Sequence, residues 1–135
     1  MTENNRFDWA ELDAVLREPT LVLTTFRRSG VGVPTGVWAA RVNGRYLFTT
    51  PSSTAKVKRL AHTERVTFES GDRRGRAIKG PVTEAIARRI VDPDILSAFR
   101  SAMRKKGPVM SRVIEIMYEL RRKDERLVFE LTRPR

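Results

Sequence analysis

Alternating apolar and β-branched residues dominate the first half of the chain and predict a run of β-strands. Strand-type segments cover residues 20–26, 31–42 and 45–50, and a basic turn separates the first segment from the second. Asn43-Gly44 joins the second segment to the third, and this dipeptide is a strong hairpin signal because both residues tolerate positive φ. The pattern therefore predicts an antiparallel meander of three strands.

The remaining chain alternates between helical and strand spacing. Asp92-Pro93 is a favoured helix start, and Gly107-Pro108 separates two helices that carry apolar stripes. The elements predicted after the meander are a helix over residues 52–62, strands over 65–70 and 76–91, helices that begin at 93 and 108, and a closing strand over 126–132.

A capping box at the start of the chain predicts one more helix. Asp8 is the expected N-cap, Glu11 follows three residues later, and Leu12, Val15 and Leu16 form one apolar face. We expect this short helix to cover the mouth or the rim of a barrel.

The order of these elements indicates the fold class. Most strands are neighbours in sequence, and a single last strand returns from far along the chain, which is an α+β pattern rather than an alternating βαβ pattern. A Greek-key or split barrel closed by the last strand satisfies this order. The length of 135 residues predicts one domain that spans residues 1–135.

The net charge of +11 indicates an anionic partner. Nucleic acid, an anionic membrane, and a phosphorylated small molecule or cofactor all fit the charge alone. The basic residues are spread along the chain with few interleaved aromatic residues, which disfavours nucleic acid. No apolar run is long enough to cross a bilayer, and the N-terminus lacks the pattern of a signal peptide. We therefore expect a cytoplasmic protein with no membrane partner.

Few residues suggest side-chain catalysis. Cysteine is absent, which excludes thiol nucleophiles and zinc-thiolate sites, and the single histidine, His62, has no evident partner for a catalytic or metal site. If the protein is an enzyme, we expect a bound cofactor to carry the chemistry and no side chain to act as an essential base.

The segment after the third predicted strand is the best candidate for a phosphate site. Hydroxyl groups precede a predicted helix whose first-turn amides lack helical partners, and Lys56 and Arg59 add positive charge on one face. Ordinary capping by Ser52 with solvated cations explains the same spacing equally well. The hydroxyl groups belong to Thr49, Thr50, Ser52, Ser53 and Thr54.

Four blocks in order resemble the pyridoxamine 5′-phosphate oxidase-like split-barrel superfamily, and more closely its bacterial subgroup that depends on the deazaflavin coenzyme F420. The blocks are LVLTTFRRSGVGVPTGVW, NGRYLFTT, STAKVKRL with ERVTFES, and RGR. The resemblance implies an antiparallel, FMN-binding type of split barrel with flanking helices. It also implies a homodimer with two cofactor sites across the interface.

The resemblance assigns cofactor-binding roles to particular residues. The backbone of a strand motif would face the ring system, Thr54 and Lys56 would meet the phosphate with help from Thr49 and Thr50, and Arg76 would reach the tail from the other subunit. Gly36 replaces a usual proline, and Ala39 stands where an aromatic residue is common. The strand motif consists of Pro34, Thr35, Gly36, Val37 and Trp38.

The function implied is hydride transfer between reduced coenzyme F420 and a small organic substrate. Two alternatives stay open at this point. One is an FMN-dependent oxidase or reductase with the same fold, and the other is a non-catalytic module that binds anions or nucleic acid.

Overall fold

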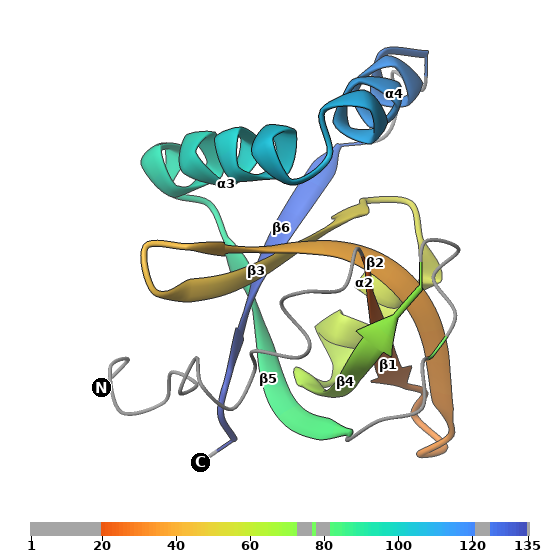
Figure 1. The fold of residues 1–135 in the computed structure, drawn as a ribbon. Coiled ribbons are helices and arrows are strands. Elements are labelled where there is room, and N and C mark those ends of the chain that lie inside the picture. The colour runs from red at the N-terminus through yellow and green to blue at the C-terminus, as the bar shows by residue number, and fades with distance from the viewer. Residues whose placement is uncertain (1–19, 73–76, 78–81, 121–124, 135) are drawn as a thin grey trace.

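A computed structural model describes residues 20–72, 77, 82–120 and 125–134, and it places six strands in a closed antiparallel barrel (Figure 1). The strands follow one another around the barrel in the order β1-β2-β3-β6-β5-β4. The elements are β1 (Thr20–Phe26), β2 (Gly32–Val42), β3 (Arg45–Pro51), α2 (Ala55–His62), β4 (Arg65–Gly71), β5 (Thr83–Ile90), α3 (Pro93–Lys106), α4 (Pro108–Leu120) and β6 (Arg126–Thr132).

The α+β split barrel predicted from the sequence is confirmed, including its closure by the last strand. β6 pairs with β3 on one side and with β5 on the other. Asn43 and Gly44 have φ values of 49° and 78°, which is the geometry that a two-residue hairpin requires between β2 and β3. The expected opening helix and Arg76 lie outside the described residues.

Aromatic and aliphatic side chains fill the inside of the barrel. Phe48 and Phe129 stack with their ring centroids 5.3 Å apart, and Tyr46 meets Phe68 edge to face at 5.9 Å. At one end of the barrel, Leu60 of α2 is buried in the same cluster. The barrel is therefore a packed core, and α2 closes one end of it.

A second apolar cluster lies on the outer face of the barrel beneath α3. Phe99 and Met103 are fully buried there against Leu47 of β3 and Val128 of β6. Asp92 caps α3 by accepting a hydrogen bond from the amide of Asp94 at 2.9 Å, as the sequence predicts. Figure 1 shows α3 across one side of the barrel and α4 projecting beyond it.

Within the described part of the chain, no helix is both long and apolar enough to cross a membrane.

Strand β2 changes partners halfway along its length. Residues Gly32–Val37 pair with β1, whereas Trp38–Val42 pair with β3. The pairing between β2 and β3 ends at Trp38 and Thr49, although β3 continues beside β6 as far as Pro51. The first half of β2 therefore has one edge that pairs with no other described strand. Three residues, 52–54, separate the end of β3 from the start of α2.

Two predicted boundaries differ from the structure. The helix expected over residues 52–62 begins at Ala55, and Thr54 rather than Ser52 is its N-cap residue. Ser52 instead exchanges hydrogen bonds with Glu125: its amide donates to the Glu125 carbonyl at 2.8 Å, and its Oγ accepts from the Glu125 amide at 2.9 Å. The prediction that Ser52 caps this helix is therefore wrong, because a contact with a residue distant in sequence occupies its side chain.

The strand expected over 76–91 is described from Thr83 to Ile90, with Ala77 bridging to Gly71.

Candidate functional site

Two threonine hydroxyls meet where β3 ends and α2 begins. Thr50 is 1% exposed, and its Oγ1 lies 3.1 Å from Oγ1 of Thr54. Thr54 donates its own hydroxyl hydrogen to the Pro51 carbonyl at 3.0 Å, so Thr50 must be the donor in the pair. The structure therefore brings these two predicted site residues together, with both hydroxyl hydrogens already engaged.

The first turn of α2 is open to an anion. Thr54 makes no side-chain bond to the helix it caps, and the first turn contains no acidic residue. The first amides of a helix have no partner within the helix, and the helix dipole gives this end partial positive charge. An anion at this position would meet backbone donors before it met the threonine hydroxyls.

Lys56 supplies a full positive charge at the same place. Its side chain is half-buried and makes no hydrogen bond or ion pair with any described residue. Burial holds the pKa of Lys56 below its usual range, and the charge of Arg59 lowers the pKa further. In the free protein, no described residue neutralises the positive charge of Lys56, which burial and Arg59 make unfavourable. A bound anion would stabilise the charged form.

Arg59 is fixed one turn further along α2. Its Nε donates to Oγ1 of Thr25 at 2.6 Å, and Thr25 is 1% exposed on β1. This bond ties α2 to the barrel wall and orients the guanidinium group.

Thr49 lies apart from the other predicted threonines. Leu47 packs under α3 and Phe48 packs inside the barrel, so the alternation of side chains along β3 places Thr49 on the outer face and Thr50 on the inner face. Oγ1 of Thr49 donates to the Leu127 carbonyl at 2.9 Å and accepts from Nε of Arg126 at 3.2 Å. The expected gathering of hydroxyls therefore reduces to Thr50 and Thr54.

The same alternation divides the strand motif on β2. Val37 belongs to the barrel core, and Thr35 shares its face, whereas Trp38 packs with the cluster beneath α3. Oγ1 of Thr35 is buried and has no hydrogen-bond partner among the described residues. Pro34 and Gly36 are exposed. The Thr35 hydroxyl therefore has unused hydrogen-bonding capacity on the inner face of β2.

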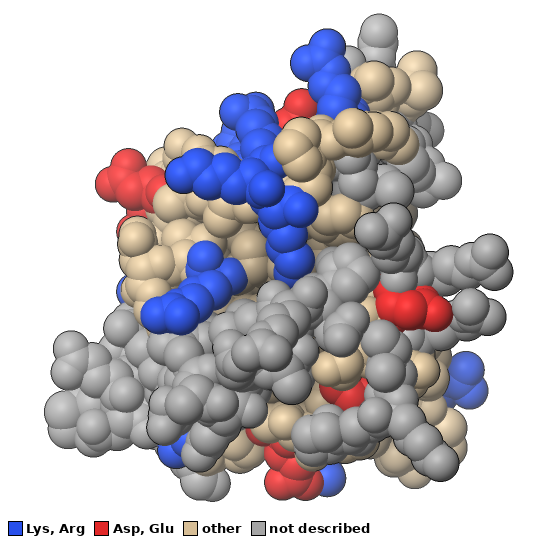
Figure 2. Space-filling model, viewed as in Figure 1, with Lys and Arg blue, Asp and Glu red and all other residues tan. Residues whose placement is uncertain are grey.

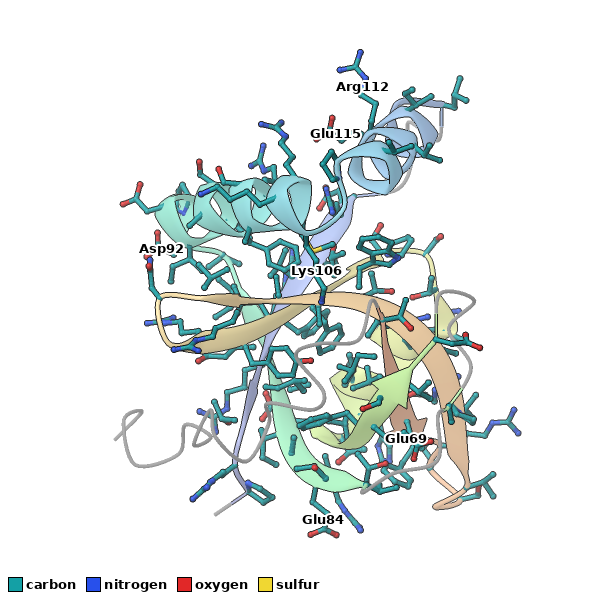
Figure 3. All side chains as sticks on the ribbon, in the orientation of Figure 1. Glu69, Glu84, Asp92, Lys106, Arg112 and Glu115 are labelled. Carbon is teal, nitrogen blue, oxygen red and sulfur yellow. The ribbon has the colours of Figure 1, made fainter. Side chains whose placement is uncertain are left out.

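Lys106 is a neighbour of this motif that the sequence did not reveal. Its Nζ donates to the Ala39 carbonyl at 2.6 Å, and Figure 3 shows it between α3 and β2. Burial lowers its pKa. The contact spans 67 residues of sequence, so no local pattern indicates it.

Three clefts among the described residues lie away from the threonine pair. One, of about 370 Å³, lies between the end of β1 and α2, and the others, of about 310 and 420 Å³, lie beside α3 and α4. None of the three is lined by Thr50, Thr54 or Lys56. Figure 2 shows Lys and Arg side chains gathered over α3 and α4.

Comparison with known proteins identifies the fold. No family model matches the chain, and no curated protein matches it. Among solved structures, it is similar to the conserved hypothetical protein Rv2991 from Mycobacterium tuberculosis, with a TM-score of 0.65 and 20% identity over 97% of this chain and 83% of the other.

Two further similar structures carry names that refer to heme. One is a heme binding protein from Mycobacterium smegmatis, with a TM-score of 0.62 and 17% identity over 93% of this chain and 51% of the other. The other is HutZ, a heme storage protein from Vibrio cholerae, with a TM-score of 0.63 and 14% identity over 96% of this chain and 92% of the other. At these identities the likeness shows the split-barrel fold alone.

The bond between Arg59 and Thr25 gives a prediction for stability. Thr25→Val keeps the shape of the side chain but leaves Nε of Arg59 without its partner, so we expect a loss of about 1–3 kcal/mol in the free energy of unfolding. Urea denaturation followed by circular dichroism measures it. The control is Lys58→Ala at an exposed position of α2, with an expected change within about 0.5 kcal/mol. Equal stability of Thr25→Val and the unmodified protein would contradict the prediction.

Proposed function

We propose that this chain is a cofactor-dependent oxidoreductase that holds the phosphate of coenzyme F420 where α2 begins. The observation that carries the proposal is Lys56, a half-buried cation in the first turn of α2 that no described carboxylate neutralises. Backbone amides of the same turn add donors suited to phosphate oxygens, and the Thr50–Thr54 hydroxyl pair, whose hydrogens are already engaged, holds the turn in place.

Each part of the site has a distinct task in this proposal. Lys56 binds the phosphate, Arg59 strengthens the local positive potential, and the Thr50–Thr54 pair fixes the backbone from which the amides project. The hydroxyl of Thr35 would hydrogen-bond a polar atom of the ring beside the open edge of β2. The bound cofactor would supply the hydride that passes to a small organic acceptor.

FMN is the alternative cofactor, because its phosphate would use the same anchor. The net charge of +11 favours the deazaflavin coenzyme, which carries a longer anionic tail than FMN. A non-catalytic anion-binding module would use the same charge without the hydroxyl of Thr35.

A homodimer is part of the proposal, and α4 supplies a specific reason for it. Glu115 of α4 pairs with Arg104 of α3 at 3.2 Å. The exposed apolar stripe of α4 consists of Val109 (79% exposed), Val113 (44%), Ile116 (45%) and Leu120 (79%). A second copy of the chain would cover such a stripe.

The cofactor assignment is tested by calorimetric titration of the purified protein with F420, FMN and hemin. We expect F420 to bind most tightly and Lys56→Ala to weaken its binding about tenfold to a hundredfold, because one charge-assisted contact is lost. Lys105→Ala, which removes the same charge from an exposed position on α3, should change the affinity less than about twofold.

Two outcomes of the titrations would overturn the proposal. One is the absence of binding by both F420 and FMN. The other is tight binding of hemin alone that disappears in His62→Ala, since two of the similar structures are named for heme and His62 is the single histidine of this chain.

The lowered pKa of Lys56 predicts how cofactor affinity depends on pH. A phosphate binds the protonated ammonium, so affinity is greatest below the pKa of Lys56 and falls as pH rises through it. Because that pKa lies below the usual lysine range, the fall begins at a lower pH than for an exposed lysine. Lys56→Arg keeps its charge and should remove the fall. Identical pH profiles for the two proteins would exclude Lys56 as the titrating group.

The dimer is tested by light scattering coupled to gel filtration. We expect a mass of twice the 15.5 kDa of one chain, and we expect Ile116→Gln to shift the equilibrium toward the monomer by weakening apolar contacts of α4. Val31→Gln, at an exposed position of the turn before β2, serves as the control and should remain dimeric. A monomeric unmodified protein at all concentrations would contradict this part of the proposal.

A further inference from the structure

A second basic site lies beside α2, at the end of β1. The cleft of about 370 Å³ is walled by Phe26 and Ala61, and the rest of its lining is Arg27, Arg28, Lys58, Arg59 and His62. No carboxylate of a described residue lines the cleft. Its volume falls within the lower part of the range of small-molecule sites.

The positive charge of this cleft is uncompensated among the described residues. Arg27, Arg28 and Lys58 are exposed, and their side chains make no hydrogen bond or ion pair with any described residue. Other arginines of the chain do have acidic partners. Those pairs are Arg45–Glu130, Arg65–Glu84, Arg88–Glu64 and Arg104–Glu115. Cations left together without an acid create a local field that attracts a multivalent anion.

Ordered backbone holds these cations in place. The amide of Arg27 donates to the Val31 carbonyl at 2.9 Å, and the amide of Gly30 donates to the Arg27 carbonyl at 2.8 Å. Gly30 has a φ of 91°, which a residue with a side chain rarely adopts, so glycine allows this turn. Arg59 is held by its bond to Thr25. The backbone and Arg59 are thus in place before a ligand arrives, and the side chains of Arg27, Arg28 and Lys58 become ordered on binding.

Phe26 adds an aromatic wall to the charged cleft. A Cβ on Gly32, its partner across β1 and β2, would come within 3.3 Å of the Phe26 ring and 2.8 Å of the Thr24 side chain, so glycine makes room for the ring. The guanidinium carbon of Arg65 lies 5.3 Å from the ring centroid. The cleft thus presents one aromatic surface next to several phosphate-binding groups.

The geometry points to a free nucleotide with two or more phosphates as the ligand of this cleft. Arginine forks bind phosphate oxygens in pairs, which suits Arg27 and Arg28, while Lys58 adds a point charge and the part of the Phe26 ring that Arg65 leaves uncovered offers an apolar contact for the base. The nucleotide site goes beyond the proposed function: it shares Arg59 with the cofactor site, but neither Lys56 nor the threonine pair lines the cleft.

Titration of the full chain with ADP, pyrophosphate and inorganic phosphate tests this inference. We expect ADP and pyrophosphate to bind, and inorganic phosphate to bind about tenfold more weakly or worse because it engages fewer cations. The double variant Arg28→Ala/Lys58→Ala should lose about tenfold or more in ADP affinity. Arg100→Ala/Lys105→Ala removes the same charge from exposed positions of α3 and should stay within about twofold.

Three results would overturn the inference. The first is a failure of ADP to bind at low salt. The second is an equal loss of ADP affinity in the two double variants, because ADP would then respond to the net charge of the protein and not to a specific site. Tighter binding of a short single-stranded oligonucleotide than of ADP is the third. Failure here is separable from failure of the cofactor proposal, because Lys56→Ala should still bind ADP and Arg28→Ala/Lys58→Ala should still bind F420.

Discussion

The register between β2 and β3 is the constraint on which the candidate site depends. The two-residue turn at Asn43 and Gly44 fixes this register, and side chains along each strand then alternate between the inside of the barrel and its outer face. A slip of one residue would bring Thr49 inside and turn Thr50 outward. The hydroxyl pair at the start of α2 therefore exists because a hairpin several residues away has only one favourable pairing.

The same alternation explains what could be predicted from the sequence. The strands, the hairpin and the cap of α3 at Asp92 follow from local signals, because each depends on residues close together in the chain. Thr49 and Thr50 are adjacent in a predicted strand, and side chains of adjacent strand residues point to opposite faces. The sequence alone therefore places these two hydroxyls on different faces of β3. Lys56 was identified correctly as a cation in the first turn of α2.

Contacts between distant segments could not be predicted from local patterns. Ser52 binds Glu125 and Lys106 binds Ala39, and no spacing or motif connects the members of either pair. The basic cleft was missed for a similar reason. Arg27 and Arg28 lie in a turn and Lys58 lies in a helix, and only the folded chain brings them around one cavity. The roles of the predicted site residues in binding remain predictions.

Pro51 has a consequence for the opening of the barrel. It stands where β3 has parted from β2 but still runs beside β6, and proline has no amide hydrogen to donate. Had this position carried an ordinary residue, an additional rung between β3 and the free edge of β2 would have had a donor available. Proline at this position therefore withholds the one donor that would extend the β2–β3 ladder by a further rung.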